Sequence, residues 1–180
     1  MTKLNPAVNS KDHIQGKNTA SLELVEYGDY QCPYCGQAYP IIKNLLRSLG
    51  ADIKFVFRNF PLSELHPDAF NAAVAAEAAG LQQKYWEMHD IIFENQGELD
   101  LESLFLYAKK IGLDLERFKN DIQKDELSTK VEQDFDSGVR SGVNGTPSFF
   151  INGKKYNGDW EEDVFHQYLK SQLIVTAKRN

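Results

Sequence analysis

The first third of the chain shows a strand pattern, then a helix pattern, then a second strand pattern. Apolar and polar residues alternate in SLELVEY, residues 21–27, so that Glu26 shares a face with two leucines. PYCGQAYPIIKNLLRSLG follows, and Pro33 near its start together with the final glycine predicts a helix. DIKFVFRNFP, residues 52–61, is rich in β-branched and aromatic residues, which predicts a second strand, central in the sheet.

The pattern then changes period and later changes back. Alanine-rich and amphipathic helix patterns run from HPDAFNAAVAAEAAG onward, strand signals return in TPSFFING and KKYNG, and WEEDVFHQYLKSQL predicts a closing helix. The polar, aperiodic start predicts an arm that packs loosely or lies along an edge. The expected divisions are an N-terminal arm at 1–20, a β-α-β unit at 21–62, a helical block at 63–141, a β-β-α unit at 142–173 and a tail at 174–180.

Composition and charge exclude several classes of partner. The 180 residues carry a formal net charge of −6, so no basic surplus exists to neutralise phosphates and no nucleic-acid partner is expected. No run approaches the roughly 18 apolar residues of a membrane helix, so no membrane span is expected. The first 20 residues lack the apolar core of a signal peptide, which predicts a cytoplasmic protein as written. If a signal or a preceding domain was trimmed from this sequence, the protein is instead expected to be exported or periplasmic.

The two cysteines of the chain, Cys32 and Cys35, lie at the start of the predicted helix. A disulfide between them would close too short a loop to restrain the unfolded chain, so a chemical role accounts for the pair better than a structural one. In the first helical turn the two sulfurs lie side by side, and the free amides and helix dipole stabilise a thiolate on the first. We therefore expect Cys32 to be an exposed nucleophile with a lowered pKa, and Cys35 to be the buried resolving cysteine.

Half of a zinc site and a pair of inert structural thiols are the two alternatives to a redox pair. A zinc site needs more ligands, and the sequence has neither a second cysteine pair nor histidines at ligand spacing. A helix start with Pro33 in its first turn is an unfavourable place to hide a thiol. We therefore predict a redox pair that uses no metal and no cofactor.

Two further residues suit a redox site. Pro147 follows Thr146 at the start of an apolar strand, where proline cannot donate to a sheet. A cis peptide bond in a functional loop accounts for this position, and a trans proline at a strand start is the alternative. Glu26 shares a face with apolar residues, so its carboxyl is expected to be buried behind the cysteines with a raised pKa, able to accept a proton from Cys35. The alternative is a strand-end glutamate turned to solvent.

These features resemble the thioredoxin superfamily, and within it the DsbA-like thiol–disulfide oxidoreductases. VEYGDYQCPYC, HPDAFNAAVAAEAAGLQQKYWEMHD and GVNGTPSFFINGKKYNG look most similar to a subgroup found both free-standing and joined to sodium/proton antiporters. The resemblance implies an α/β thioredoxin fold with an all-helical insertion. It also implies Cys32 as nucleophile, Cys35 as resolver and Pro147 as the cis-proline facing them, with Thr146 beside it. Glu26 falls where the family often has a buried acid.

The residues between the cysteines depart from the family pattern. Strongly oxidising members carry Pro-His there, whereas this chain has Pro33 and Tyr34. A tyrosine supplies no positive charge to the thiolate, so we expect a less strongly lowered pKa and a less oxidising potential. Pro-Tyr is also typical of glutaredoxins, which makes a glutathione-dependent reductase of that type the nearest alternative, although those domains are shorter and lack the helical block.

The expected function is thiol–disulfide exchange with protein substrates through a mixed disulfide, with glutathione or a redox partner protein as a second partner. Thr146, Pro33 and Tyr34 are the candidate substrate-contacting residues, and the loop at Thr146 would pair with an extended segment. The sequence leaves open whether the protein oxidises or reduces. A non-enzymatic redox-sensing module is a further alternative. A glutathione-conjugating or isomerase enzyme on the same fold usually keeps one active-site Ser or Cys, so the cysteine pair disfavours it.

Overall fold

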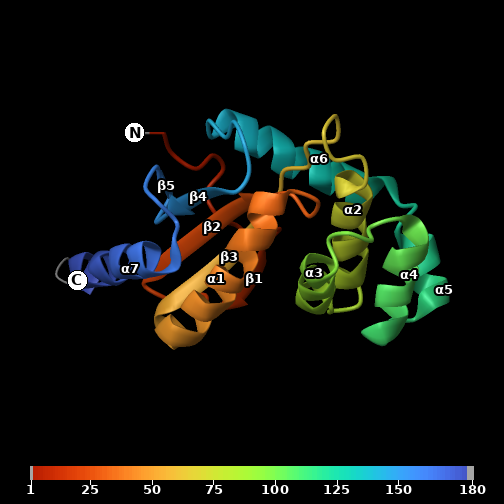
Figure 1. Ribbon diagram of the computed structural model, residues 1–180, viewed down its shortest axis with the longest axis horizontal. Coiled ribbons are helices and arrows are strands. Elements are labelled where there is room, and N and C mark those ends of the chain that lie inside the picture. The colour runs from red at the N-terminus through yellow and green to blue at the C-terminus, as the bar shows by residue number, and fades with distance from the viewer. Residues whose placement is uncertain (1, 178–180) are drawn as a thin grey trace.

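The computed structural model describes residues 2–177 and contains one mixed five-stranded sheet (Figure 1). The strands are β1 (His13–Gly16), β2 (Leu22–Gly28), β3 (Ile53–Asn59), β4 (Ser148–Ile151) and β5 (Lys154–Lys155). Their order across the sheet is β1-β3-β2-β4-β5. β2 and β3 are parallel, and every other neighbouring pair is antiparallel. β2 and β3 are the two strands predicted from the alternating and aromatic patterns.

Two helices accompany the strands, and a block of helices separates β3 from β4. α1 (Pro33–Leu49) leads through the 3₁₀ turn η1 (Gly50–Asp52) to β3, and α7 (Glu162–Ala177) follows β5. The block contains α2 (Ala69–Gly80), α3 (Tyr85–Glu94), α4 (Leu101–Lys110), α5 (Leu115–Asp121) and α6 (Asp125–Arg140). It stands to one side of the sheet, with α7 at the opposite side (Figure 1). Within residues 2–177, no helix is both long and apolar enough to cross a membrane.

The two ends of the described chain are more regular than the sequence predicts. β1 extends the edge of the sheet by pairing with β3, so the predicted arm lies along an edge as a strand. Leu4 is buried in the core, and its N–H donates to the carbonyl of Gly153 at 2.9 Å. At the other end α7 continues to Ala177, so the tail predicted at 174–180 begins inside this helix. Residues 178–180 lie outside the described residues.

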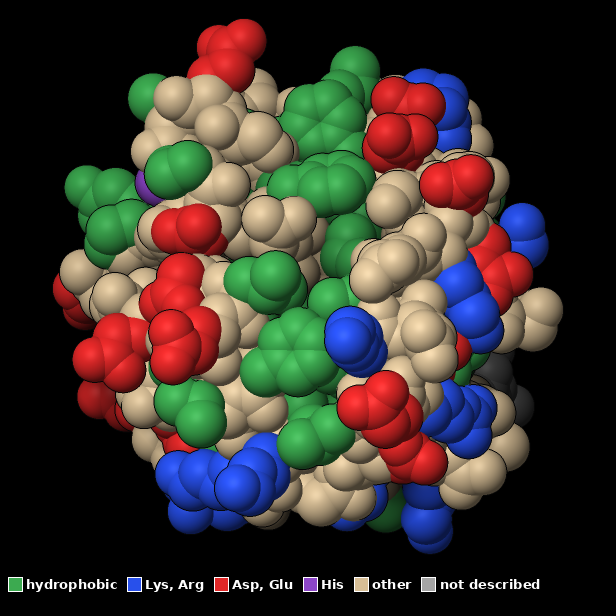
Figure 2. Space-filling view, turned by 90° about the vertical axis from the view of Figure 1, so that its right-hand side faces the viewer, with side chains coloured by type: hydrophobic (Ala, Val, Ile, Leu, Met, Phe, Trp, Pro, Cys, Tyr) green, Lys and Arg blue, Asp and Glu red, His purple; other side chains and the backbone are tan. Residues whose placement is uncertain are grey.

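The central strand β2 is covered on both faces, as expected for a strand with a parallel neighbour. Leu22 and Leu24 pack in the larger core together with α1, the helical block and both cysteines. Val25 and Tyr27 pack in a second core on the other face. On the side of the molecule formed by the helical block, apolar side chains form a band flanked by charged groups (Figure 2). The chain therefore passes from the end of β2 at Gly28 to the start of α1 in a region that has a packed core on each face of the sheet.

Candidate active site

The two cysteines lie where β2 is followed by α1. β2 ends at Gly28, residues 29–31 form a loop, and Cys32 is the N-cap residue of α1 with an extended backbone (φ −71°, ψ 122°). Pro33 is at the start of the helix, where its missing N–H leaves no hydrogen bond unmade. Cys35 lies one turn further along, and both sulfurs are free thiols. The predicted placement of the pair at a helix start is confirmed.

Cys32 is less accessible than the sequence predicts. Its exposed fraction is only 4%, and that of Cys35 is 0%. As a thiol, Cys32 donates to the carbonyl oxygen of Thr146 with a sulfur–oxygen distance of 3.5 Å, so the loop before β4 lies against the sulfur. The prediction of an exposed nucleophile is therefore wrong, because a loop distant in sequence covers the helix start. A reacting group has to reach the sulfur past this loop.

The surroundings of Cys32 favour its thiolate. Its pKa is lowered to about 5, chiefly by a hydrogen bond from the thiol of Cys35. Burial acts in the opposite direction, while Thr146 and the backbone N–H groups of Cys35 and Tyr34 lower the pKa further. These N–H groups belong to the first helical turn and have no intrahelical partner. Cys32 is therefore almost fully ionised at pH 7, and the predicted lowered pKa is confirmed.

Cys35 and Glu26 share the apolar space behind Cys32. Burial raises the pKa of Cys35 well above its ordinary value, and its hydrogen bond to Cys32 and the charge of Glu26 add to the rise. Glu26 is 3% exposed, and burial together with the nearby Cys32 raises its pKa to about 8. The prediction of a buried acid is confirmed, and the solvent-facing alternative is wrong. A carboxyl with this pKa can take up and release a proton near neutral pH.

The loop before β4 completes the site. The Thr146–Pro147 peptide bond is cis, as predicted. The hydroxyl of Thr146 is buried, and in the described part of the chain nothing lies in hydrogen-bonding geometry to it, so it is free to turn toward a thiolate on Cys32. Pro33 and Tyr34 are exposed in the first turn of α1, and Tyr34 is 61% exposed. The predicted site residues therefore lie around one sulfur.

Asp29 organises the loop before Cys32, and the sequence analysis missed it. Its buried carboxylate accepts hydrogen bonds of 2.8 to 3.1 Å from the backbone N–H groups of Gln31, Cys32 and Leu62 and from Nδ1 of His66. The N–H of Asp29 in turn donates to the sulfur of Cys35 at 3.4 Å. An aspartate in a loop three residues before a helix N-cap is typical of an Asx turn, and this signal was present in the sequence.

Gln96, between α3 and α4, ties the helical block to the same loop. Its Nε2 donates to the carbonyl oxygens of Tyr30 at 2.8 Å and Cys32 at 3.0 Å. Gly36, directly after the second cysteine, makes room for this contact, because a Cβ at that position would overlap the amide of Gln96. No local pattern marks Gln96, since it lies 64 residues from Cys32.

The chemistry available to these residues follows from their protonation. The site holds one sulfur that ionises readily, one that keeps its proton, and a carboxyl that titrates near pH 8. Among residues 2–177, no three or more His, Cys, Asp or Glu side chains are grouped as a metal ion would require. A thiolate beside a protonated thiol is suited to attack on a disulfide followed by release of the product.

Comparison with known proteins agrees with this geometry. The sequence matches the family model described as Thioredoxin over residues 8–171. The chain belongs to the thioredoxin family. The thiol–disulfide exchange protein α-DsbA2 of Wolbachia pipientis is 25% identical, with a TM-score of 0.81 over 91% of this chain and 88% of that one. BdbD of Bacillus subtilis is 23% identical, with a TM-score of 0.84 over 96% and 97% of the two chains.

The predicted α/β thioredoxin fold with an all-helical insertion is thereby confirmed, and this thioredoxin-family chain is a DsbA-like thiol–disulfide oxidoreductase with a Cys-x-x-Cys pair. The Na(+)/H(+) antiporter NhaA 1 of Salinispora arenicola is 40% identical over 174 residues, which is 97% of this chain and 26% of that protein. The chain therefore spans about a quarter of the length of the antiporter relatives that it matches. The predicted similarity to a subgroup joined to sodium/proton antiporters is confirmed.

Replacement of Asp29 by alanine should lower the free energy of unfolding by about 3 kcal/mol, because the N–H groups of Gln31 and Leu62 lose their acceptor and the buried N–H of Cys32 keeps only the carbonyl of residue 29. Urea-induced unfolding measures the change. Asp136→Ala is the matched control, since its carboxylate is exposed and an exposed substitution changes stability by no more than about 0.5 kcal/mol. Equal unfolding free energies for the two variants would contradict the role assigned to Asp29.

Proposed function

We propose that the protein exchanges disulfides with protein substrates through a mixed disulfide on Cys32 that Cys35 resolves. In the reducing direction, the Cys32 thiolate attacks a substrate disulfide, and one substrate sulfur leaves as a thiolate. Cys35, after losing its proton, attacks the Cys32 sulfur and releases the second substrate sulfur, which leaves the protein with a Cys32–Cys35 disulfide. The oxidising direction is the reverse. The observation that carries the proposal is the opposite pKa shift of two neighbouring sulfurs.

Glu26 acts in this proposal as the proton acceptor for Cys35. Cys35 holds its proton firmly while Cys32 is a thiolate, so its attack requires a base within the same buried space. The charge of Glu26 is felt by Cys35, and a pKa of about 8 leaves a fraction of Glu26 ionised at pH 7. The carboxylate takes the proton as the Cys35 sulfur attacks, and returns it when the pair is reduced again.

Substrate binding is assigned to the loop at Thr146 and Pro147 and to the exposed first turn of α1. Backbone groups of the residues before β4 would pair with an extended substrate segment, in the manner of an added strand. Pro33 and Tyr34 are exposed beside the buried Cys32 sulfur, which supports a role in contacting the segment that carries the substrate sulfur.

We expect a reduction potential of about −220 mV for the Cys32–Cys35 couple. Thioredoxin has a cysteine pKa of about 7 and a potential of about −270 mV. The lower pKa of Cys32 stabilises the dithiol form about 50-fold more at pH 7, which corresponds to about 50 mV. Equilibration with glutathione buffers of known ratio measures the potential. Tyr34→His adds a cation beside the thiolate and should make the couple more oxidising, whereas a wild-type potential at or below about −270 mV would contradict the proposal.

A reduction potential in this range permits disulfide exchange in either direction, so the redox state of the compartment determines which direction is used. In a reducing cytoplasm the protein would run as a reductase or isomerase, and outside the cytoplasm it would run as an oxidase. Turnover of a scrambled protein disulfide in defined glutathione buffers separates these modes. A protein that changes its redox state without any turnover would instead be a sensing module.

A further inference from the structure

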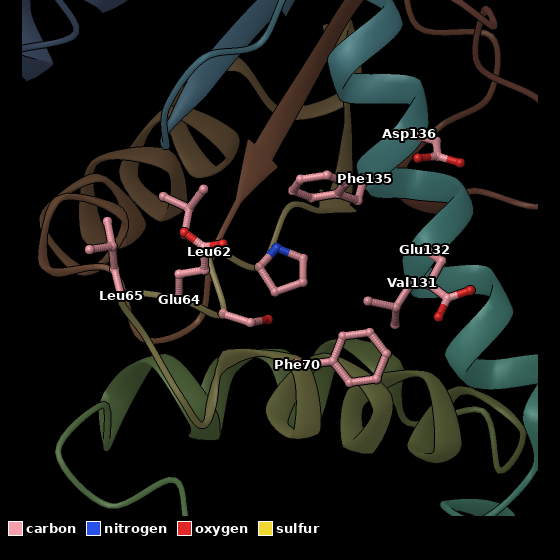
Figure 3. A pocket seen from close by; sticks show the side chains of 10 residues that line it. Leu62, Glu64, Leu65, Phe70, Val131, Glu132, Phe135 and Asp136 are labelled. Carbon is pink, nitrogen blue, oxygen red and sulfur yellow. The ribbon is translucent and has the colours of Figure 1, made fainter.

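A groove opens beside the cysteine loop on the side of the helical block. It encloses about 580 Å³ between the segment after β3, α2 and α6. Pro61, Leu62, Ser63, Glu64 and Leu65 line it on one side. Phe70 of α2 and four residues of α6 line the other side, namely Val131, Glu132, Phe135 and Asp136. The rings of Phe70 and Phe135 turn toward the hollow (Figure 3). The exchange mechanism described above uses none of these side chains.

The floor of the groove is apolar and firmly held. Leu62, Phe70 and Phe135 are half-buried, and the ring of Phe135 stacks on Phe60 with 4.3 Å between centroids. Leu65, at the edge, is 74% exposed. Apolar side chains that remain this exposed to solvent in a concave surface indicate a binding position for another apolar group.

The rim of the groove is acidic. Glu64, Glu132 and Asp136 line it and are exposed, and neither a lysine nor an arginine is among its lining residues. Within residues 2–177 none of the three carboxylates forms an ion pair. An apolar hollow with unpaired carboxylates around it complements an apolar side chain that has basic neighbours.

Asp29 connects the groove to the cysteines. One of its carboxylate oxygens accepts from the N–H of Leu62 and the other from the N–H of Cys32. Two amides held by one carboxylate lie no more than about 8 Å apart. Because an extended chain advances about 3.3 Å per residue, a substrate whose sulfur is at Cys32 brings a side chain two to four residues away within reach of the groove.

We propose that the groove binds an apolar side chain of the substrate protein, carried next to lysine or arginine and about two to four residues from the reacting cysteine. This specificity site rests on the proposed exchange function. It lies on the Leu62 side of Cys32, whereas the carbonyl of Thr146 contacts the sulfur from the loop before β4. The substrate class is therefore a cysteine in a basic, apolar segment.

Single-cysteine peptides, each held as a mixed disulfide with 2-mercaptoethanol, test the proposal. The first has a lysine and a phenylalanine, the phenylalanine three residues before the cysteine, and its two relatives replace phenylalanine by serine or lysine by glutamate. With the reduced protein at low salt, the first peptide should react about ten-fold faster than the serine peptide and about five-fold faster than the glutamate peptide. Equal rates for all three would overturn the groove assignment.

Bis(2-hydroxyethyl) disulfide separates failure of this site from failure of the exchange function, because it is too small to need the groove. No reaction with it or with any peptide would overturn the exchange function. The charge reversals Glu132→Lys and Asp136→Lys together should invert the lysine preference and leave this small-molecule rate unchanged. Asp52→Lys with Asp163→Lys makes the same charge change away from the groove lining, and should keep the preference. An unaltered preference in the rim variant would overturn the proposal.

Filling the groove is the second test, and it needs no change of charge. Ser63 is exposed and lines the groove, so Ser63→Trp should remove the phenylalanine preference while Ser63→Ala keeps it. Sedimentation at the assay concentration tests the other occupant, a second copy of the chain. A dimer that Ser63→Trp dissociates would overturn the proposal of a substrate site.

Discussion

Replacement of Cys32 by serine is expected to lower the rate of disulfide exchange at least about a thousand-fold, to that of the uncatalysed reaction. The reason is that Cys32 is the sulfur whose pKa is lowered to about 5, while Cys35 keeps its proton and is fully buried. A serine hydroxyl does not ionise near neutral pH and cannot form a disulfide. Dithiothreitol-driven reduction of a protein disulfide measures the loss.

Cys35→Ser is the matched control for this variant, since it keeps the attacking thiolate and removes only the resolving sulfur. It should accumulate a mixed disulfide with the substrate, visible as a mass increase that a reductant reverses. Turnover that survives in Cys32→Ser, or a mixed disulfide that forms on Cys35, would show that Cys32 is not the attacking sulfur.

Replacement of Glu26 by glutamine is expected to stabilise the fold and slow the resolving step. The pKa of Glu26 is about 8 in the fold and about 4.5 when unfolded, so the unfolded state binds fewer protons between these values. Stability therefore falls as the pH rises from about 4.5 to about 8, by up to about 3 kcal/mol at pH 7. Glutamine never ionises, so urea unfolding of the variant should show a gain at pH 7 that disappears toward pH 4.

The same variant should prolong the mixed disulfide about a hundred-fold, because Cys35 loses the base that takes its proton. Glu23→Gln is the control on the same strand. Its carboxylate pairs with Lys54 at 3.0 Å and is partly exposed, so this change should cost at most about 1 kcal/mol and leave resolution unaltered. A loss of stability in Glu26→Gln at pH 7, with no change in the resolving rate, would contradict the role of Glu26 as the proton acceptor for Cys35.

The parts of the site that the sequence predicts are those whose cause is local. A helix start with proline after the first cysteine favours a thiolate, whatever the rest of the fold does. Alternation along β2 places Glu26 on the face of two leucines, and burial then raises its pKa. Proline at the start of a strand marks an unusual loop, and the bond before Pro147 is indeed cis.

The parts that the sequence does not reveal depend on contacts between distant segments. The coverage of Cys32 comes from the loop at Thr146, 114 residues away, so no local pattern could predict its low exposure. Gln96 is likewise one polar residue in a surface loop until the fold brings it to the cysteine loop. β1 is a short polar stretch that becomes a strand because β3 offers a free edge, which is a tertiary cause.

The contact of Gly36 with Gln96 means that the geometry of the redox loop depends on a residue of the helical block. Grafting residues 30–35 onto a smaller scaffold would leave the carbonyls of Tyr30 and Cys32 without their shared donor. The substitution Gly36→Ala would place a Cβ against the amide of Gln96, so this side chain would have to shift and its hydrogen bonds to the cysteine loop would be disturbed. Shortened versions of this protein must therefore keep the α3–α4 connection, however far from the sulfurs it stands in the chain.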